Sequence, residues 1–238
     1  MTDKKELTKL IYAMTLGDGS LGLRNVPTVE VRQHERPQYD RPSNSWYSTA
    51  QLIEHKDYLD WQISILSEIT SAKLYKYSAR KSLNGYIDSA KYNLETKRHP
   101  FFTTMRNRIY VNGKKQLSPH DLKLLDYQML AILYMDDGWI EKTDKSTLRG
   151  CAIATHSFTS VENKYLRDLI AEKLGIHFDV KPHKQRNDSI KYYLRANRVN
   201  AERMIEKIYS YVMPSFLYKL DVSVERPTPN KNLGDDMI

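Results

Sequence analysis

The sequence predicts an α+β fold built from two αββαββα repeats related by a pseudo-two-fold axis. Two observations carry this prediction. A run of apolar and small residues that ends in Asp-Gly occurs at residues 10–19 and again at residues 130–138. A second pair of segments, 88–94 and 188–194, shares Asp, Ser, Lys, Tyr and Leu at matching positions. Because each of these segments follows its own Asp-Gly run after two strands and a helix, the chain is expected to fold as two halves of one plan.

The elements of the first half follow from hydrophobic periodicity and turn residues. The run before Asp18 reads as a helix buried against another element. Residues 83–85, Leu-Asn-Gly, indicate a hairpin turn. The expected elements are, in order, a helix at 5–16, a strand pair at 20–34, a strand at 46–51, a helix at 55–69, strands at 73–81 and 86–96, and a helix at 99–108. A basic connector is expected at 110–119 before the second run.

The second half is expected to repeat this order. Thr159 or Ser160 is a suitable cap for a helix that Gly175 ends. The expected elements after the second run are a strand pair at 138–157, a helix at 161–174, strands at 176–184 and 189–195, and a helix at 201–212. These patterns divide the chain into residues 1–118, residues 119–224 and a flexible tail at 225–238 with few apolar residues.

Composition limits the classes of protein that this chain can be. The 238 residues suffice for one large or two small domains, and 40% hydrophobic with 28% charged residues is ordinary for a globular protein. The net charge of +8 favours a polyanionic partner. A single cysteine, Cys151, excludes an internal disulfide framework and a multi-cysteine zinc site. No run approaches the length of a membrane span, so a soluble intracellular protein is expected that acts in the compartment where it is made.

The two acids that close the apolar runs are the candidate catalytic residues. Each run places a carboxylate at the last turn of an apolar helix, where the helix dipole disfavours negative charge. The glycine that follows suits the left-handed conformation that ends many helices. One such acid would be a solvated helix end, which is the simple alternative. Two of them, Asp18 and Asp137, on similar helices indicate a shared role.

At these residues the sequence resembles the LAGLIDADG homing endonucleases of the single-chain type with two motifs. Gly17-Asp18-Gly19 and Asp136-Asp137-Gly138 match the closing acid and glycine of that motif. The chain departs from the pattern at the third position, which is Ala13 and Ile132 where the family has Gly. The seventh position is small in the family, and here it is Gly17 in one copy and Asp136 in the other. These departures predict a looser or asymmetric helix contact in the second copy.

The resemblance covers nearly all of residues 5–222 and implies more than the pattern does. It implies that the two motif helices pack side by side at the axis and that each half forms a curved antiparallel sheet. It also implies double-strand cleavage with staggered ends at a long asymmetric DNA target, by a monomer encoded in a mobile intron.

Packing of the motif helices would bring Asp18 and Asp137 to the same end of the pair. Two close carboxylates raise each other's pKa, and a divalent cation offsets that repulsion. Oxygen ligands favour Mg²⁺, for which Mn²⁺ can substitute, over zinc. Gly17 and Asp136, the residues before the two acids, are assigned to the same metal site. A metal held in this way can activate water for phosphodiester hydrolysis.

In the family, a basic residue from each half approaches the active site from outside the motif helix. Lys115 precedes the second motif, and Lys219 closes the second half. These two lysines are expected to contact phosphate or activate water. Lys114 is the alternative in the first half.

The polar faces of the strands are expected to contact the bases. Arg, Asn and Gln can pair with base edges in the major groove, while lysines mostly bind phosphates. Strand alternation places Ile176, Phe178, Val180, Ile190, Tyr192 and Leu194 toward the core. The outward residues assigned to DNA are Arg32, His34, Arg80, Lys91, Asn93, Lys181, His183, Gln185, Lys191, Tyr193 and Arg195.

The leading hypothesis is therefore a metal-dependent, site-specific DNA endonuclease. The main alternative is an RNA maturase that uses the same fold to assist splicing of its host intron, with intron RNA as partner. A third alternative is a regulator that binds DNA without cleaving it. The presence of both Asp18 and Asp137 and of both basic loops favours the nuclease.

Overall fold

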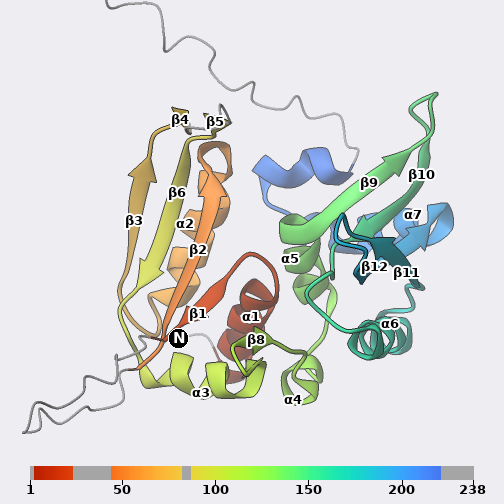
Figure 1. The fold of residues 1–238 in the computed structure, drawn as a ribbon. Coiled ribbons are helices and arrows are strands. Elements are labelled where there is room, and N and C mark those ends of the chain that lie inside the picture. The colour runs from red at the N-terminus through yellow and green to blue at the C-terminus, as the bar shows by residue number, and fades with distance from the viewer. Residues whose placement is uncertain (1–2, 24–43, 82–86, 221–238) are drawn as a thin grey trace, which may run out of the picture.

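The fold is that of a computed structural model, which describes residues 3–23, 44–81 and 87–220 (Figure 1). The expected strand pair at 20–34 therefore lies partly outside the described residues, as does the tail at 225–238. The first half contains α1 (Lys4–Leu16), β1 (Ser20–Gly22), β2 (Trp46–Leu52), η1 (Ile53–His55), α2 (Lys56–Leu66), β3 (Ala72–Tyr77), β4 (Arg80–Lys81), β5 (Ile87–Asp88), β6 (Lys91–Thr96) and α3 (Pro100–Ile109). The second contains α5 (Tyr127–Asp137), β9 (Gly138–Lys142), β10 (Leu148–Ile153), α6 (Ser160–Leu174), β11 (Asp179–Lys184), β12 (Ile190–Asn197), α7 (Arg198–Ile208), η2 (Tyr209–Tyr211) and η3 (Pro214–Leu220).

Each half forms its own four-stranded antiparallel sheet. The strand order is β1-β2-β6-β3 in the first sheet and β9-β10-β12-β11 in the second. Matching the two orders pairs β1 with β9, β2 with β10, β6 with β12 and β3 with β11. The αββαββα plan and the α+β class predicted from the sequence are confirmed.

The motif helices α1 and α5 lie between the two sheets (Figure 1) and pack against each other. Residues 10–16 of α1 and 129–135 of α5 are buried on all sides. A helix that is apolar all round must be covered all round, and these two are covered by each other and by the flanking elements. At the opposite end of the pair from the acids, Lys9 of α1 forms an ion pair of 2.6 Å with Asp126, the N-cap of α5.

Helices cover one face of each sheet and leave the other face open. In the second half, α6 and α7 lie against β10, β11 and β12 (Figure 1). Leu94 of β6 and Leu194 of β12, which end the two similar segments, are both fully buried. The internal similarity therefore marks equivalent core strands in the two halves.

Two connecting regions differ from the sequence-based prediction. The connector at 110–119 is a two-stranded ribbon of β7 (Tyr110–Val111) and β8 (Lys114–Lys115), followed by the short helix α4 (Pro119–Leu122). The ribbon turns at Asn112 and Gly113, whose φ angles of 50° and 76° suit a two-residue hairpin loop. The expected strand 73–81 is divided into β3 and β4, and β4 pairs only with β5.

One predicted core position is wrong. Ile190 was placed toward the core by alternation, but it is 58% exposed because it lies beside the turn at the tip of the β11–β12 hairpin. Among the described residues, no helix has the length and apolar character needed to cross a membrane.

Candidate active site

The two motif helices end at the same place, because Gly17 lets their ends approach closely. Asp136 lies in the last turn of α5. A Cβ atom added at Gly17 would lie 2.0 Å from its Oδ2. The side chain of Asp136 occupies the space that the glycine leaves. The asymmetric contact expected from the two seventh positions is thus present, with a carboxyl group from one helix facing a glycine of the other.

Gly19 and Gly138, the glycines that follow the two acids, allow close packing and do not adopt a left-handed backbone conformation. Positive φ among the described glycines occurs only at Gly113 and Gly175. A Cβ at Gly19 would instead lie 2.5 Å from the carbonyl of Met14, and one at Gly138 would lie 2.3 Å from the Tyr134 ring. The left-handed conformation expected after the acids is therefore wrong, and close packing explains these residues.

Asp136 links the ends of α1 and α5. Its Oδ2 accepts a hydrogen bond of 3.2 Å from the backbone N–H of Asp18. Its Oδ1 is buried and has no hydrogen-bond partner among the described residues, although the buried Tyr58 hydroxyl is near enough to interact with it electrostatically. Burial, reinforced by the charge of Asp18, raises the pKa of Asp136 well above its usual value.

Asp18 is held by a chain of side chains from β2 and η1. The Nε2 of Gln51 donates to its Oδ2 at 2.7 Å, and Oε1 of Gln51 lies 3.3 Å from Nδ1 of His55. The His55 ring stacks on Phe216 of η3 at 4.0 Å. The residue is exposed on one side, but desolvation of its carboxyl raises the pKa of Asp18, while Gln51 and the nearby lysines oppose that shift.

Asp137 is the last residue of α5 and lies close enough to Asp18 for their charges to interact. Burial and the charge of Asp18 raise the pKa of Asp137 to about 6, against the effect of Lys115 and Lys219. The two acids predicted to meet at the axis are therefore brought together, and each disfavours ionisation of the other.

A lysine from each half binds the last turn of its own motif helix. Nζ of Lys115 donates to the carbonyl of Gly17 at 2.8 Å. Nζ of Lys219 donates to the carbonyls of Met135 at 2.5 Å and Asp136 at 3.2 Å. Burial lowers the pKa of both lysines, and the three acids partly restore it. Lys114 is exposed on the other side of the ribbon, so the structure places Lys115 at the acids.

The residues at this site fit a divalent cation of the magnesium kind. The available donors are carboxylate and carbonyl oxygens, which such ions prefer. Asp136 Oδ1 lacks a hydrogen-bond partner among the described residues, and burial raises the pKa of Asp18 and of Asp137, so a bound cation would favour their ionised forms. Within residues 3–23, 44–81 and 87–220, three or more acid, histidine or cysteine side chains do not converge to hold a metal by themselves. A cation here would therefore rely on the paired acids and on other oxygen atoms.

The predicted DNA-contact residues fall into three groups. Arg32 and His34 lie outside the described residues. Arg80 lies on β4, away from the four-stranded sheets, whereas Lys91 and Asn93 lie on β6. The remaining residues lie on or beside the β11–β12 hairpin, and they are Lys181, His183, Gln185, Lys191, Tyr193 and Arg195.

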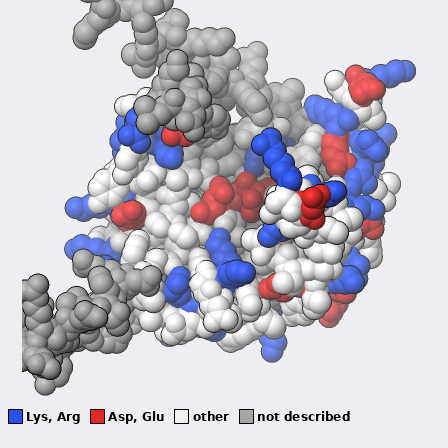
Figure 2. Space-filling model, viewed as in Figure 1, with Lys and Arg blue, Asp and Glu red and all other residues white. Residues whose placement is uncertain are grey.

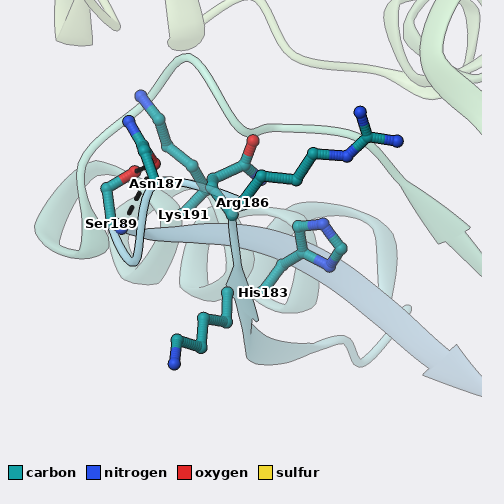
Figure 3. Close-up of a pocket in the computed structure, with 7 residues that line it drawn as sticks. His183, Arg186, Asn187, Ser189 and Lys191 are labelled. Carbon is teal, nitrogen blue, oxygen red and sulfur yellow. Dashed lines mark hydrogen bonds between the residues drawn. The ribbon is translucent and has the colours of Figure 1, made fainter.

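The β11–β12 hairpin forms an open basic hollow of about 600 Å³ at its tip (Figure 3). His183, Arg186 and Lys191 line this hollow, and their side chains point away from the strands. At the other end of the hairpin, Arg195 is engaged by Glu141 of β9, with a guanidinium-to-carboxylate distance of 2.7 Å. Figure 2 shows acidic side chains gathered near the middle of the face drawn, between the sheets, with Lys and Arg spread on both sides.

Sequence reasoning missed three residues of the site. Gln51, His55 and Glu141 reach their positions only through tertiary packing. Gln51 carried one usable signal, because it is a polar residue at an inward position of a strand that alternates between buried and exposed residues.

The protein has two antiparallel sheets joined by a pair of buried helices, and each helix ends in an acid with a lysine beside it. This arrangement defines a two-motif protein with one site shared by both motifs. The model of the LAGLIDADG DNA endonuclease family matches residues 10–204. The chain belongs to this family, as its resemblance predicted.

Three known proteins are similar to this chain. A cytochrome b mRNA maturase, bI2, of Debaryomyces hansenii is 28% identical over 224 residues, which cover 91% of this chain and 74% of the maturase. The uncharacterized protein MJ1098 of Methanocaldococcus jannaschii is 31% identical over 140 residues, or 59% of this chain and 49% of that protein. The structure of the homing endonuclease I-WcaI bound to its DNA recognition sequence matches with a TM-score of 0.71 and 18% identity, and covers 92% of this chain and 88% of that one.

Proposed function

We propose that the protein is a site-specific endonuclease that hydrolyses both strands of a long, asymmetric duplex DNA target and requires Mg²⁺ or Mn²⁺. The observation that carries this proposal is the meeting of Asp18 and Asp137 at one end of the helix pair, with Lys115 and Lys219 beside them. Family membership supports the activity, and the net charge of +8 supports a polyanionic substrate.

In this proposal the chain's own residues have separate roles. Asp18 and Asp137 would hold the metal with the carbonyl oxygens of Gly17 and Asp136, and a bound metal supplies an activated water and stabilises the leaving oxygen. Gln51 orients the Asp18 carboxylate through its 2.7 Å hydrogen bond. Lys115 and Lys219 donate to backbone carbonyls at the helix ends, and in this proposal they would exchange these hydrogen bonds for contacts with phosphate oxygens.

The two-fold plan supports action as a monomer. Each half supplies one motif helix, one acid and one lysine, so a single chain holds one set of residues for each DNA strand. The open sheet faces, with Asn93 on one side and the β11–β12 hairpin on the other, would contact the two halves of the target. A mobile intron as the host element remains part of this proposal.

The direct experiment is cleavage of a randomised duplex library by the purified chain with Mg²⁺, followed by sequencing of the ends. A single enriched long sequence with staggered cuts on both strands is expected. An excess of chelator should abolish the cuts. Uncut DNA under all metal conditions, with a protein shown to be folded, would remove the nuclease proposal.

One observation favours a second function. The relative that is 28% identical over 91% of this chain is named as an mRNA maturase. A maturase role predicts specific binding to an intron RNA and faster splicing of it, with no need for the acids. Splicing assays with the wild-type chain and with Asp137→Asn separate the two functions, because only cleavage depends on the carboxylate.

A further inference from the structure

The open face of the second sheet carries a continuous group of aromatic rings. The ring centroids of Trp139 and Tyr193 are 5.7 Å apart, those of Tyr193 and His156 are 5.9 Å apart, and those of His156 and His183 are 5.2 Å apart. These four residues, called the aromatic surface below, come from β9, β12, the segment after β10, and β11.

Strand register explains why these rings meet. Ala152 of β10 lies opposite Trp139 on one side and opposite Arg195 on the other. Its small side chain leaves room for longer side chains of the two flanking strands, β9 and β12, to come together above it. Ala152 is fully buried as a result, although it lies on the face that α6 and α7 do not cover.

The ion pair beside the aromatic surface removes the strongest base-reading group of this face. Both Arg195 and Glu141 have side chains that are 21% exposed, and Arg195 donates to Glu141 through Nε at 2.8 Å. Trp139 remains 37% exposed and His183 is exposed as well. The accessible part of this face therefore consists of aromatic rings with lysines beside them, Lys181 opposite Tyr193 and Lys191 opposite His183 across the β11–β12 pair.

The equivalent position in the first half has the opposite character. Ser20 of β1, Ser48 of β2 and Asn93 of β6 line a hollow of about 270 Å³ that also reaches Asp18. The hydroxyls of Ser20 and Ser48 lie 3.0 Å apart, and Oδ1 of Asn93 is buried without a hydrogen-bond partner among the described residues. The two halves of the protein thus offer different chemistry to the two halves of a duplex.

We propose that the aromatic surface recognises the 5-methyl groups of thymines in the half of the DNA target that the second repeat covers. In the major groove, thymine differs from the other bases by an apolar methyl group, which is read by apolar contact. Trp139 is two residues from Asp137, so the thymines it contacts lie on the side of the cut nearest the second repeat. Lys181 and Lys191, which lie beside the rings, bind the flanking phosphates. This inference rests on the proposed function and adds the base preference of one half-site.

The test uses deoxyuridine, which differs from thymidine only by the missing methyl group. After a target has been selected from the duplex library, each thymine of the second half-site is replaced by deoxyuridine, and binding is measured by titration in Ca²⁺. Removing one contacted methyl should weaken binding about fourfold, since the complex no longer gains the burial of one methyl group. The same replacement in the first half-site should change binding much less.

Variants assign the effect to the rings. Trp139→Ala and Tyr193→Ala should each make the thymine and deoxyuridine targets bind alike, while Trp139→Phe should keep most of the difference. Tyr165→Ala is the matched control, because Tyr165 is 39% exposed on α6, on the other side of the sheet. The wild-type comparison needs no variant, so it decides the proposal even if an alanine variant fails to fold.

The failures can be told apart. Three results would overturn the role of the aromatic surface while leaving the nuclease proposal intact. The selected targets could lack thymine in the second half-site, or the wild type could bind the thymine and deoxyuridine targets equally. The third result is a binding difference that stays unchanged in Trp139→Ala and Tyr193→Ala. Loss of single-stranded RNA binding by Trp139→Ala, with unchanged duplex binding, would also overturn it, since unpaired bases stack on such rings. A wild-type chain that binds no duplex would end the proposed function itself.

Discussion

The carboxyl group of Asp136 fills the space beside Gly17 that any other residue at position 17 would occupy. A Cβ there would lie 2.0 Å from Oδ2 of Asp136. The same oxygen accepts a hydrogen bond from the N–H of Asp18, so one side chain both limits how the helices approach and fixes the backbone of Asp18.

Gly17→Ala should therefore destabilise the fold by about 1–3 kcal/mol, the usual cost of overpacking a well-filled contact. The free energy of unfolding from urea titration measures this. The double variant Gly17→Ala with Asp136→Ala should lose less than the sum of the two single changes, because the second substitution removes the clashing atom. Additive losses would show that the two residues do not compete for the same space.

The two lysines should be separable from their exposed neighbour. Lys115→Met and Lys219→Met should each lower the cleavage rate about 10²–10³-fold, the usual loss when a charged group that stabilises the transition state is removed. Single-turnover cleavage at saturating protein measures the rate. Lys114→Met is the matched control, because Lys114 lies next to Lys115 on β8 but is exposed. Equal effects at 114 and 115 would contradict the placement of Lys115 at the acids.

The predictability of this site from sequence differs from residue to residue. The αββαββα plan follows from period and repetition, and the repeat ending at Leu94 and Leu194 marks true core strands. Asp18 and Asp137 follow from a motif that needs no distant information. The bridging carboxyl of Asp136 does not, because its partner is 118 residues away.

The lysines show where local chemistry could have helped. Asn112-Gly113 is a strong hairpin signal, and pairing of Val111 with Lys114 and of Tyr110 with Lys115 puts the two lysines on opposite faces of the ribbon. That signal was available in the sequence. Lys219 was chosen through the family resemblance, because its own segment, the seven-residue 3₁₀ helix η3, has no long apolar period that would place it.

Stability should fall as pH rises when no divalent metal is present. Burial raises the pKa of Asp137 from 3.8 to about 6, so the folded protein holds this proton more tightly than the unfolded chain does. The resulting stabilisation is complete below 3.8 and is lost as pH rises through about 6. Asp18 and Asp136, whose pKa values are also raised, act in the same direction.

Urea titrations in chelator at several pH values measure this loss. Asp137→Asn should flatten the curve in that window, since the amide does not titrate. Added Mg²⁺ should also flatten it by favouring the ionised acids. A free energy of unfolding that rises across the window would contradict the raised pKa of Asp137.

DNA binding should weaken steeply with salt. A duplex held by two sheets with lysines at their borders releases counterions, so the logarithm of the binding constant should fall linearly with the logarithm of salt concentration. Lys191→Ala should reduce the slope by about 1 if Lys191 neutralises one phosphate. Titration at four or more salt concentrations measures the slope, and a slope near zero for the wild type would argue against the DNA role.

Asp18→Asn and Asp137→Asn should each abolish double-strand cleavage while leaving DNA affinity within a few-fold of the wild type. Asparagine keeps the shape of the side chain, so the contact with Gln51 and the packing of α1 on α5 should survive. What would disappear is the negative charge proposed to hold the metal, and with it the activation of water and the stabilisation of the leaving oxygen, which are worth several kcal/mol. Cleavage in Mg²⁺ and binding in Ca²⁺ measure the two quantities separately.

Asp126→Asn is the matched control for these two acids, since Asp126 also flanks α5 but pairs with Lys9 at the far end of the helix. It should retain cleavage. If the acids are only solvated helix ends, all three variants should cut at the wild-type rate. If the chain is a maturase that does not cut, the wild type should leave DNA intact and both acid variants should still assist splicing. Wild-type cleavage by either Asp18→Asn or Asp137→Asn would rule out a mechanism that needs both carboxylates.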